Sequence, residues 1–216
     1  QVSIKDILKA IQEKKLTFAM TSATQSNSGA GAYLGFLYSL LGNPDMITLE
    51  SLKDEQLAKD IKLLLSGVNR SSGSSEWLKE LFLESDFDAM VNYEALIIST
   101  NQALIKKGKE PLYVVYPYDG ISLADSPLGY IDNGSSDKED KFLKFQEFML
   151  SLNVQQQLNA LGRRTGLAMT IDNPDKSVFN PQWGIDTKKI LSPIRLPKAE
   201  VIKEALNLYQ SAFRKP

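Results

Sequence analysis

The sequence predicts a layered α/β fold, and three observations support this class. Short apolar segments of strand length alternate with longer segments whose apolar residues recur at helical spacing. Two clusters of hydroxyl, amide and glycine residues stand directly before helical segments. With 216 residues, of which 43% are hydrophobic, the chain can bury a sizeable core as one large domain or two small lobes.

The first half of the chain shows the alternation most clearly. Apolar side chains at helical spacing predict a helix over residues 3–14, and residues 16–20 follow as a short apolar strand. Further helices are expected over residues 33–41, 54–65 and 75–84. Residues 87–98 predict a buried strand that enters a helix or a second strand.

The second half contains more irregular structure. β-branched and aromatic residues predict a strand over residues 112–116, a turn over 117–120 and an extended piece over 126–131. A polar loop at 133–140 precedes helices over 140–152 and 154–161, and Gly162 ends the second of them. Prolines predict an irregular segment from Arg163 onward, and an amphipathic helix is expected over 199–213.

The segment TFAMTSATQSNSGAGAYLGFLYSLL, residues 17–41, is the most informative one for function. Its glycines, Gly29 and Gly31, leave room for a ligand or another backbone. Its short polar donors and acceptors are Thr21, Ser22, Thr24, Ser26, Asn27 and Ser28. Because the first turn of a helix carries unpaired N–H groups and positive dipole charge, a small polar or anionic ligand would suit it. The alternative is an ordinary capped helix.

A second segment, VNRSSGSS at residues 68–75, repeats this pattern before a helix. Two helix N-termini facing one site is one hypothesis, and a solvated loop in which Ser75 only caps its helix is the other. Glu94 is a single charge in an apolar neighbourhood, where a carboxylate is usually paired or directed at a ligand. Tyr116 and Tyr118 could stack on a ligand or belong to the core, whereas Trp77 and Trp183 are expected to pack internally.

Composition excludes several functions. The formal net charge of −1, from 25 basic and 26 acidic residues, argues against a surface that binds nucleic acid or anionic membrane. The chain has no histidine and no cysteine, which excludes Cys/His zinc sites and catalytic pairs or triads that need these residues. No apolar run approaches the about 20 residues of a membrane-spanning helix. Because the chain begins at Gln1 without a methionine, we expect a piece of a longer protein.

A catalytic role is not predicted. Ser28 or Ser74 as a nucleophile would need Lys, Asp or Glu as its base. Neither serine lies in an S-x-x-K motif or a G-x-S-x-G elbow. We therefore expect no enzyme activity and no cofactor.

Four segments in this order resemble a known family: FAMTSATQSNSGAGAYLGFL, MVNYEALII, YVVYPYDGISLADSPLGYID and FLKFQEFMLSLNVQQQLNALGRRTG. They are similar to extracellular solute-binding proteins of the type 2 periplasmic-binding fold, which include molybdate- and phosphate-binding proteins. The segments TSATQSNSG, FNPQWGID and LPKAEVIKEALNLYQSAFRKP resemble, more narrowly, the region that precedes a von Willebrand factor A domain in some bacterial surface proteins. No DxSxS metal motif is present, so such a domain would lie downstream.

The resemblance implies a periplasmic binding protein-like II fold with three-layer α/β/α lobes. Residues 16–112 would form the second lobe, and residues 113–216 would form the C-terminal part of the first lobe with a wrapping tail and final helix. Residues 1–15 would be a leading helix, and the N-terminal part of the first lobe would be missing. The expected location is extracellular or periplasmic, with a membrane anchor in parts outside this chain.

The residue pattern and the resemblance together predict a ligand site. Its expected residues are Thr21, Ser22, Gln25, Ser26, Asn27, Ser28, Gly29, Ser71, Ser72, Ser74, Tyr93, Glu94, Tyr116, Asp119 and Gly120. Neutral N–H and hydroxyl donors would bind an oxyanion, whereas Glu94 and Asp119 would favour a cation, an amine or sugar hydroxyls. Arg163 and Arg164 could contact an anion or bind the last carbonyls of the preceding helix.

The predicted function is a non-catalytic extracellular solute-binding domain, for uptake by an ABC-type transporter or for sensing. Its partners would be a small solute and either a membrane transporter or a surface protein. The alternative is a surface interaction or adhesion module that kept this fold and no longer binds a solute.

Overall fold

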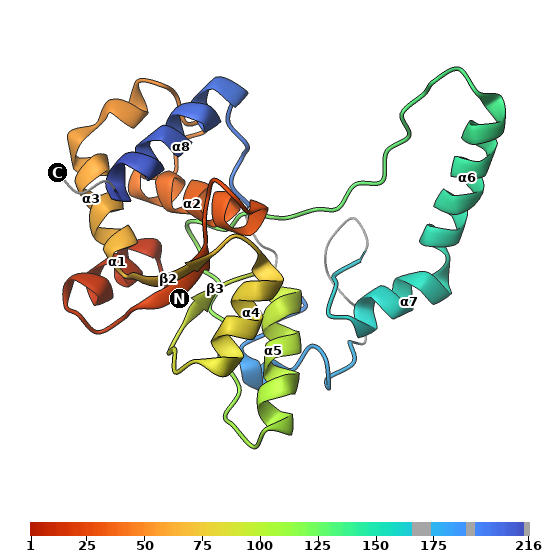
Figure 1. Ribbon diagram of the computed structural model, residues 1–216, viewed down its shortest axis with the longest axis horizontal. Helices are drawn as coiled ribbons and strands as arrows, with labels where there is room; N and C mark the ends of the chain where they lie inside the picture. Colours follow the sequence, from red (N-terminus) through yellow and green to blue (C-terminus); the bar gives the residue numbers. More distant parts are fainter. Residues whose placement is uncertain (166–173, 189–192, 214–216) are drawn as a thin grey trace. The chain divides into compact units, whose positions relative to one another are not determined.

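The computed structural model describes residues 1–165, 174–188 and 193–213 (Figure 1). The chain divides into a first unit, residues 1–124 and 191–216, and a second unit, residues 125–190. The predicted boundary at residues 112 and 113 does not match this division. Residues 113–124 belong to the first unit because Asp119 and Gly120 contact its first two helices.

A small parallel sheet lies in the first unit. Its strands are β1 (Phe18–Thr21), β2 (Val68–Ser72) and β3 (Met90–Val91), in the order β2-β1-β3. Every residue of the central strand β1 is buried. The strand predicted over residues 16–20 is thus present with a small shift. β2 lies in the serine-rich segment 68–75, for which no strand was predicted, and its middle is exposed.

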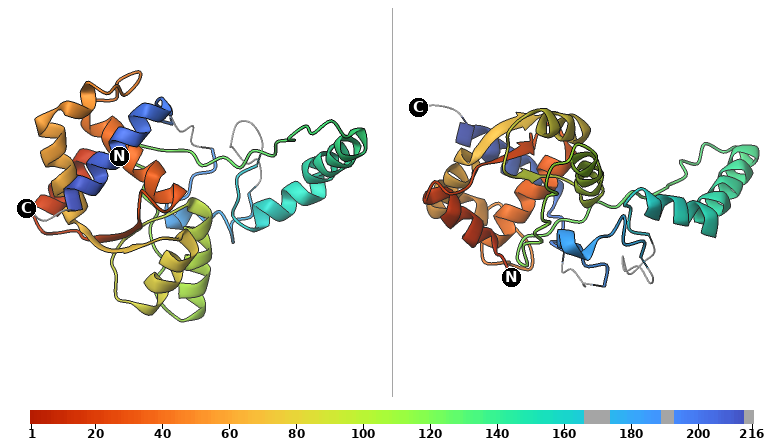
Figure 2. Two further views of the ribbon diagram at one scale, coloured as in Figure 1. Left: turned by 45° about the horizontal axis from the view of Figure 1, so that its top comes forward. Right: turned by 90° about the horizontal axis from the view of Figure 1, so that it is seen from below.

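Helices cover both faces of this sheet (Figures 1 and 2). The first unit contains α1 (Ile4–Gln12), α2 (Asn27–Leu40), α3 (Glu55–Ser66), α4 (Ser75–Glu84), α5 (Glu94–Lys106), α8 (Ala199–Phe213) and the short 3₁₀ helix η1 (Ser51–Lys53). Helix α4 packs beside α5, while α3 packs against α1 and α8. The α/β class is therefore confirmed, together with each predicted helix of this unit. Helix α2 begins at Asn27, within the polar segment 26–29 and six residues before its apolar pattern begins at Tyr33.

The strand predicted over residues 112–116 is wrong. These residues carry no strand assignment and neither do residues 126–131, although the turn at 117–120 is present. High β propensity does not make a strand without a neighbouring strand to bind.

The second unit contains α6 (Ser136–Leu150), α7 (Leu152–Ala160) and the 3₁₀ helix η2 (Pro181–Trp183). Both predicted helices are present, and Gly162 ends α7 in a left-handed conformation with φ of 77°. Trp183 is buried as expected, but Trp77 on α4 is 72% exposed, so its predicted packing role is wrong. Residues 166–173 and 189–192 of the predicted irregular segment lie outside the described residues.

Helix α2 runs through the core of the first unit and contacts the C-terminal helix. Tyr33 and Leu37 of α2 are fully buried, and the ring of Tyr33 meets Tyr209 of α8 edge to face at 5.1 Å between centroids. The Tyr33 hydroxyl has no hydrogen-bond partner among the described residues. Burial raises the pKa of this phenol above its usual value.

We expect Tyr33→Phe to stabilise the first unit at neutral pH by about 1 kcal/mol, because it removes an unsatisfied buried hydroxyl. Because burial raises the pKa of Tyr33, the unfolded state loses this proton first as pH rises above about 10, so the stability of the wild-type protein falls there. Thermal unfolding at neutral and alkaline pH measures both effects, and the variant should lose less stability in alkali. Tyr118→Phe, at an exposed tyrosine, is the control. A destabilised Tyr33→Phe would show that the hydroxyl has a favourable partner.

Candidate functional site

Three strand-to-helix connections meet at one edge of the sheet. β1 leads into α2 through residues 22–26, β2 into α4 through residues 73–74, and β3 into α5 through residues 92–93. Because the strands are parallel, all three connections lie at their carboxyl ends. Open α/β sheets bind ligands at this edge.

Four hydroxyl groups form a connected set at this edge, which we call the hydroxyl cluster: Thr21, Ser26, Ser28 and Ser75. Ser28 Oγ lies 2.7 Å from Thr21 Oγ1 and 2.7 Å from Ser75 Oγ. Ser26 Oγ lies 3.1 Å from Ser28 Oγ and 3.4 Å from Ser75 Oγ. The cluster therefore joins the end of β1 to the first turns of α2 and α4. Thr21 and Ser28 are buried.

The helices that begin here lack side-chain caps. Ser26 and Ser74 occupy the N-cap positions of α2 and α4 with extended backbones, but neither side chain makes a capping hydrogen bond. Ser3 and Asp54 do cap α1 and α3 in the same unit. The first N–H groups of α2 and α4 are thus left with their partial positive charge for another acceptor.

Gly29 allows α2 to start directly against β1. A Cβ atom at this position would lie 2.4 Å from the carbonyl oxygen of Thr21 and 2.7 Å from that of Ser22. Both neighbours are backbone atoms, which cannot rotate away. Gly29 therefore permits a close approach, as predicted, but the group that approaches it is the backbone at the end of β1.

The third connection is attached to the other two by amide side chains. Asn27 Nδ2 donates to the Tyr93 hydroxyl at 3.1 Å, and Asn92 Nδ2 donates to the carbonyl oxygen of Ser75 at 3.0 Å. Asn92 and Ser75 were missing from the predicted site. Ser75 could have been found from its place in the repeated hydroxyl pattern, whereas Asn92 has no such signal.

The remaining predicted hydroxyl residues lie on the same edge but bond locally. Ser22 Oγ lies 3.0 Å from Thr24 Oγ1, and Ser72 Oγ donates to the carbonyl oxygen of Ser74 at 3.1 Å. Ser72 is paired with Thr21 in the β1/β2 register. The Gln25 amide lies over Gly73, where a Cβ atom would be 3.1 Å from Gln25 Oε1. Ser71 is exposed on β2.

The Glu94 carboxylate has a hydrogen-bond partner within the protein. It is the first residue of α5, is half-buried, and its Oε1 accepts a hydrogen bond from the Tyr116 hydroxyl. A carboxylate at this position is also stabilised by the N-terminal end of α5.

Asp119 and Gly120 are not brought together with the hydroxyl cluster. Asp119 Oδ1 accepts from the backbone N–H of Ile4 at 2.9 Å, and its Oδ2 accepts from Ser39 Oγ at 2.6 Å. Gly120 packs against the backbone of Gly35. Ser39 and Gly35 lie eleven and seven residues along α2 from Ser28, so these contacts are about 16 Å and about 10 Å from the cluster along the helix.

The two arginines considered for anion binding lie in the second unit. The backbone N–H of Arg163 donates to the Leu158 carbonyl oxygen at the end of α7, and the Arg164 guanidinium donates to the Asp186 carbonyl oxygen at 3.0 Å. The contact of Arg163 with the end of α7 is made by its backbone, and Asp186 lies outside that helix. A contact between an arginine side chain and the last carbonyls of α7 therefore stays a prediction.

The electrostatics of the hydroxyl cluster are those of neutral donors. All hydrogen-bond partners within it are uncharged. Among the described residues, no group of three or more acidic side chains could hold a metal ion. The cluster therefore supplies neutral hydrogen-bond donors and acceptors.

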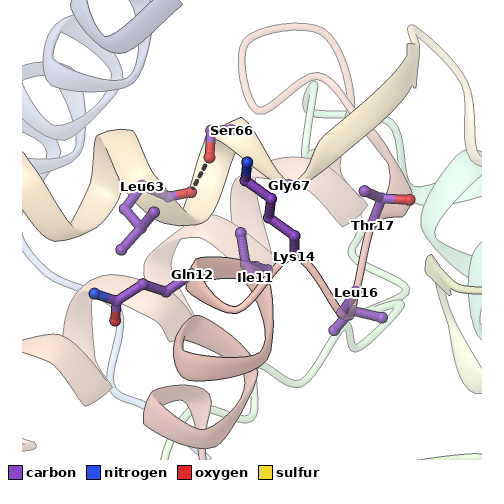
Figure 3. Close-up of a pocket in the computed structure, with 8 residues that line it drawn as sticks. All are labelled: Ile11, Gln12, Lys14, Leu16, Thr17, Leu63, Ser66 and Gly67. Carbon is purple, nitrogen blue, oxygen red and sulfur yellow. Dashed lines mark hydrogen bonds between the residues drawn. The ribbon is translucent and has the colours of Figure 1, made fainter.

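A separate cavity of about 340 Å³ lies at the opposite edge of the sheet (Figure 3). It is lined by Ile11, Gln12, Lys14, Leu16, Thr17, Leu63, Ser66 and Gly67. Leu16 and Thr17 precede β1, and Gly67 precedes β2, so this cavity is at the amino ends of the strands. It shares no residue with the hydroxyl cluster.

Comparison of the chain with protein-family models, curated proteins and solved structures finds no match. Within residues 1–165, 174–188 and 193–213, no helix is long and apolar enough to cross a membrane.

Proposed function

We propose that this chain is a non-catalytic, extracellular solute-binding domain of the periplasmic binding protein-like II type. In this proposal a small oxyanion or another small polar molecule binds at the N-termini of α2 and α4. The observation that carries the proposal is the hydroxyl cluster between two helix N-termini without side-chain caps, at the carboxyl edge of a parallel sheet.

The chemistry of such a ligand follows from the donors. Backbone N–H groups at a helix start and serine hydroxyls can surround an oxygen-rich solute without a countercharge. The Tyr116 hydroxyl donates to Glu94 Oε1 but leaves the negative charge of this carboxylate in place, so an uncharged polyol would meet less repulsion here than an anion. An oxyanion or a polyol fits this set of donors better than a cation does.

Binding would require the serines to exchange partners. Ser28 and Ser75 now hydrogen-bond each other at 2.7 Å, and each hydroxyl could turn toward a ligand oxygen without moving its helix. The solute would then replace the hydrogen bond between the two serines by bonds to itself.

Ligand binding can be tested by thermal unfolding of the protein with phosphate, sulfate, molybdate, sugars, amino acids and polyamines. A ligand at 100 times its dissociation constant should stabilise the protein by about 2.7 kcal/mol. We expect the double variant Ser28→Ala/Ser75→Ala to bind the same ligand at least about tenfold more weakly, because it removes two hydroxyl donors. Ser211→Ala, at an exposed serine of α8, is the matched control. Absence of stabilisation by every compound would contradict solute binding.

The second candidate is a surface interaction module that kept the fold and lost its solute. It is favoured by the same cluster, since the hydroxyls of Thr21, Ser28 and Ser75 already satisfy one another. If this is its function, the double variant should leave partner binding unchanged and no small molecule should stabilise the protein. A transporter or another surface protein would be the partner, with a membrane anchor elsewhere.

A further inference from the structure

The segment LYVVY, residues 112–116, has the side-chain pattern of a strand but no strand partner. Tyr113 and Val115 are 71% and 47% exposed, while Leu112, Val114 and Tyr116 are half-buried. Alternation with a period of two is the pattern of a β-strand with one face on the protein and one face in solvent. Pro111 and Pro117 bound the segment on both sides.

One edge of this segment is occupied by a side chain that replaces a strand. Asn101 of α5 is fully buried, its Nδ2 donates to the carbonyl oxygen of Leu112 at 2.9 Å, and its Oδ1 accepts from the N–H of Leu112 at 2.7 Å. In a strand-like backbone, alternate residues direct their N–H and C=O groups to the same side. The N–H and C=O groups of Leu112 face Asn101 of α5, and in an extended backbone those of Tyr113 and Val115 point to the opposite edge.

The backbone groups on that opposite edge are available to another strand. Over the part of the chain that the structure describes, the N–H and C=O groups of Tyr113 and Val115 have no hydrogen-bond partner. Such groups on a segment rich in β-branched and aromatic residues form a template for another strand.

We propose that this edge binds the same segment of a second copy of the chain as an antiparallel strand pair. Tyr113 of each copy lies opposite Val115 of the other, and Val114 lies opposite Val114. The two Tyr113/Val115 pairs each exchange both backbone hydrogen bonds, which gives four bonds across the pair. The central Val114 pair is of the type without hydrogen bonds.

The second copy is the occupant because the segment is complementary to itself. In this register Tyr113 of each copy faces the β-branched Val115 of the other, a favourable cross-strand pair. No charged residue lies between Pro111 and Pro117, so two copies meet without repulsion. Since Asn101 blocks the other edge at Leu112, we expect pairing to close after two copies and to give a symmetric dimer instead of a fibre.

Sedimentation velocity of the full chain over a concentration series tests this inference. We expect a monomer–dimer equilibrium in the wild-type protein, and the loss of the dimer in Val115→Pro, which removes one edge N–H from each copy. Val115→Thr keeps the N–H group and the β-branched shape, so it should dimerise within about threefold of wild type. Hydrogen exchange should show that the amides of Tyr113 and Val115 become protected at high concentration while the amide of Val114 does not.

Val115→Lys provides a second variant in case the proline variant does not fold. It retains the backbone donor but adds an edge lysine, and we expect at least a tenfold weaker dimer. A wild-type protein that stays monomeric at the highest concentration overturns the inference. A dimer that Val115→Lys and a folded Val115→Pro leave unchanged also overturns it, because the contact would then lie elsewhere.

Discussion

Replacement of Gly35 by alanine should destabilise the first unit by about 3 kcal/mol. A Cβ atom at Gly35 would lie 2.2 Å from the carbonyl oxygen of Gly120, far inside van der Waals contact. The neighbouring atom is backbone, so α2 and residues 117–121 must move apart. The change is informative because alanine is otherwise favoured over glycine within a helix by about 1 kcal/mol, so steric overlap and helix propensity predict opposite signs.

Unfolding by urea, followed by circular dichroism, measures this loss. Gly31→Ala is the matched control in the same helix, since its Cβ atom would meet only the side chain of Ser122 at 2.9 Å. That side chain can rotate, so the control should change stability by less than about 1 kcal/mol. A Gly35→Ala protein as stable as wild type would mean that residues 117–121 can separate from α2 at little cost.

Replacement of Asp119 by alanine should cost about 2 to 3 kcal/mol, because two donors lose their acceptor. The carboxylate accepts from the N–H of Ile4 at the start of α1 and from the buried hydroxyl of Ser39 on α2. Asp119→Asn keeps one acceptor oxygen and should recover part of the loss. Hydrogen exchange at the Ile4 amide should accelerate in the alanine variant, which reports the broken contact directly.

Asp45→Ala is the control for removal of an exposed aspartate, and its effect should stay within about 0.5 kcal/mol. Should Asp119→Ala unfold no more easily than this control, Asp119 would not connect α1 and α2 energetically. Its carboxylate would then again be a candidate ligand contact.

Helices could be predicted well from the sequence because an apolar face decides them locally. Residues 75–84 and 199–213 were predicted with the bounds that the structure has. Strands were harder, since pairing depends on a distant neighbour. Strand β2, with the sequence VNRSS, is exposed in its middle and shows no apolar alternation, while LYVVY alternates but has no adjacent strand.

The position of the hydroxyl cluster could also be predicted, because both serine-rich segments directly precede helices. The hydrogen bonds that connect its members could not be predicted. The contact between Ser28 and Ser75 and that between Asn92 and Ser75 join residues that are distant in the chain. The same limit explains Asp119, whose partners Ile4 and Ser39 give no local sign of the contact.

The position of α8 in the core of the first unit also constrains how the protein is made. Val201, Ala205 and Tyr209 of this helix belong to the same buried cluster as α2 and α3. During translation the whole second unit, residues 125–190, leaves the ribosome before α8 does. The core of the first unit therefore cannot be completed until α8 is synthesised, although all three strands of its sheet are already available. In a chain stalled before α8, the apolar side of α3 would be exposed to chaperones. We expect this core to pack only after α8 has left the ribosome.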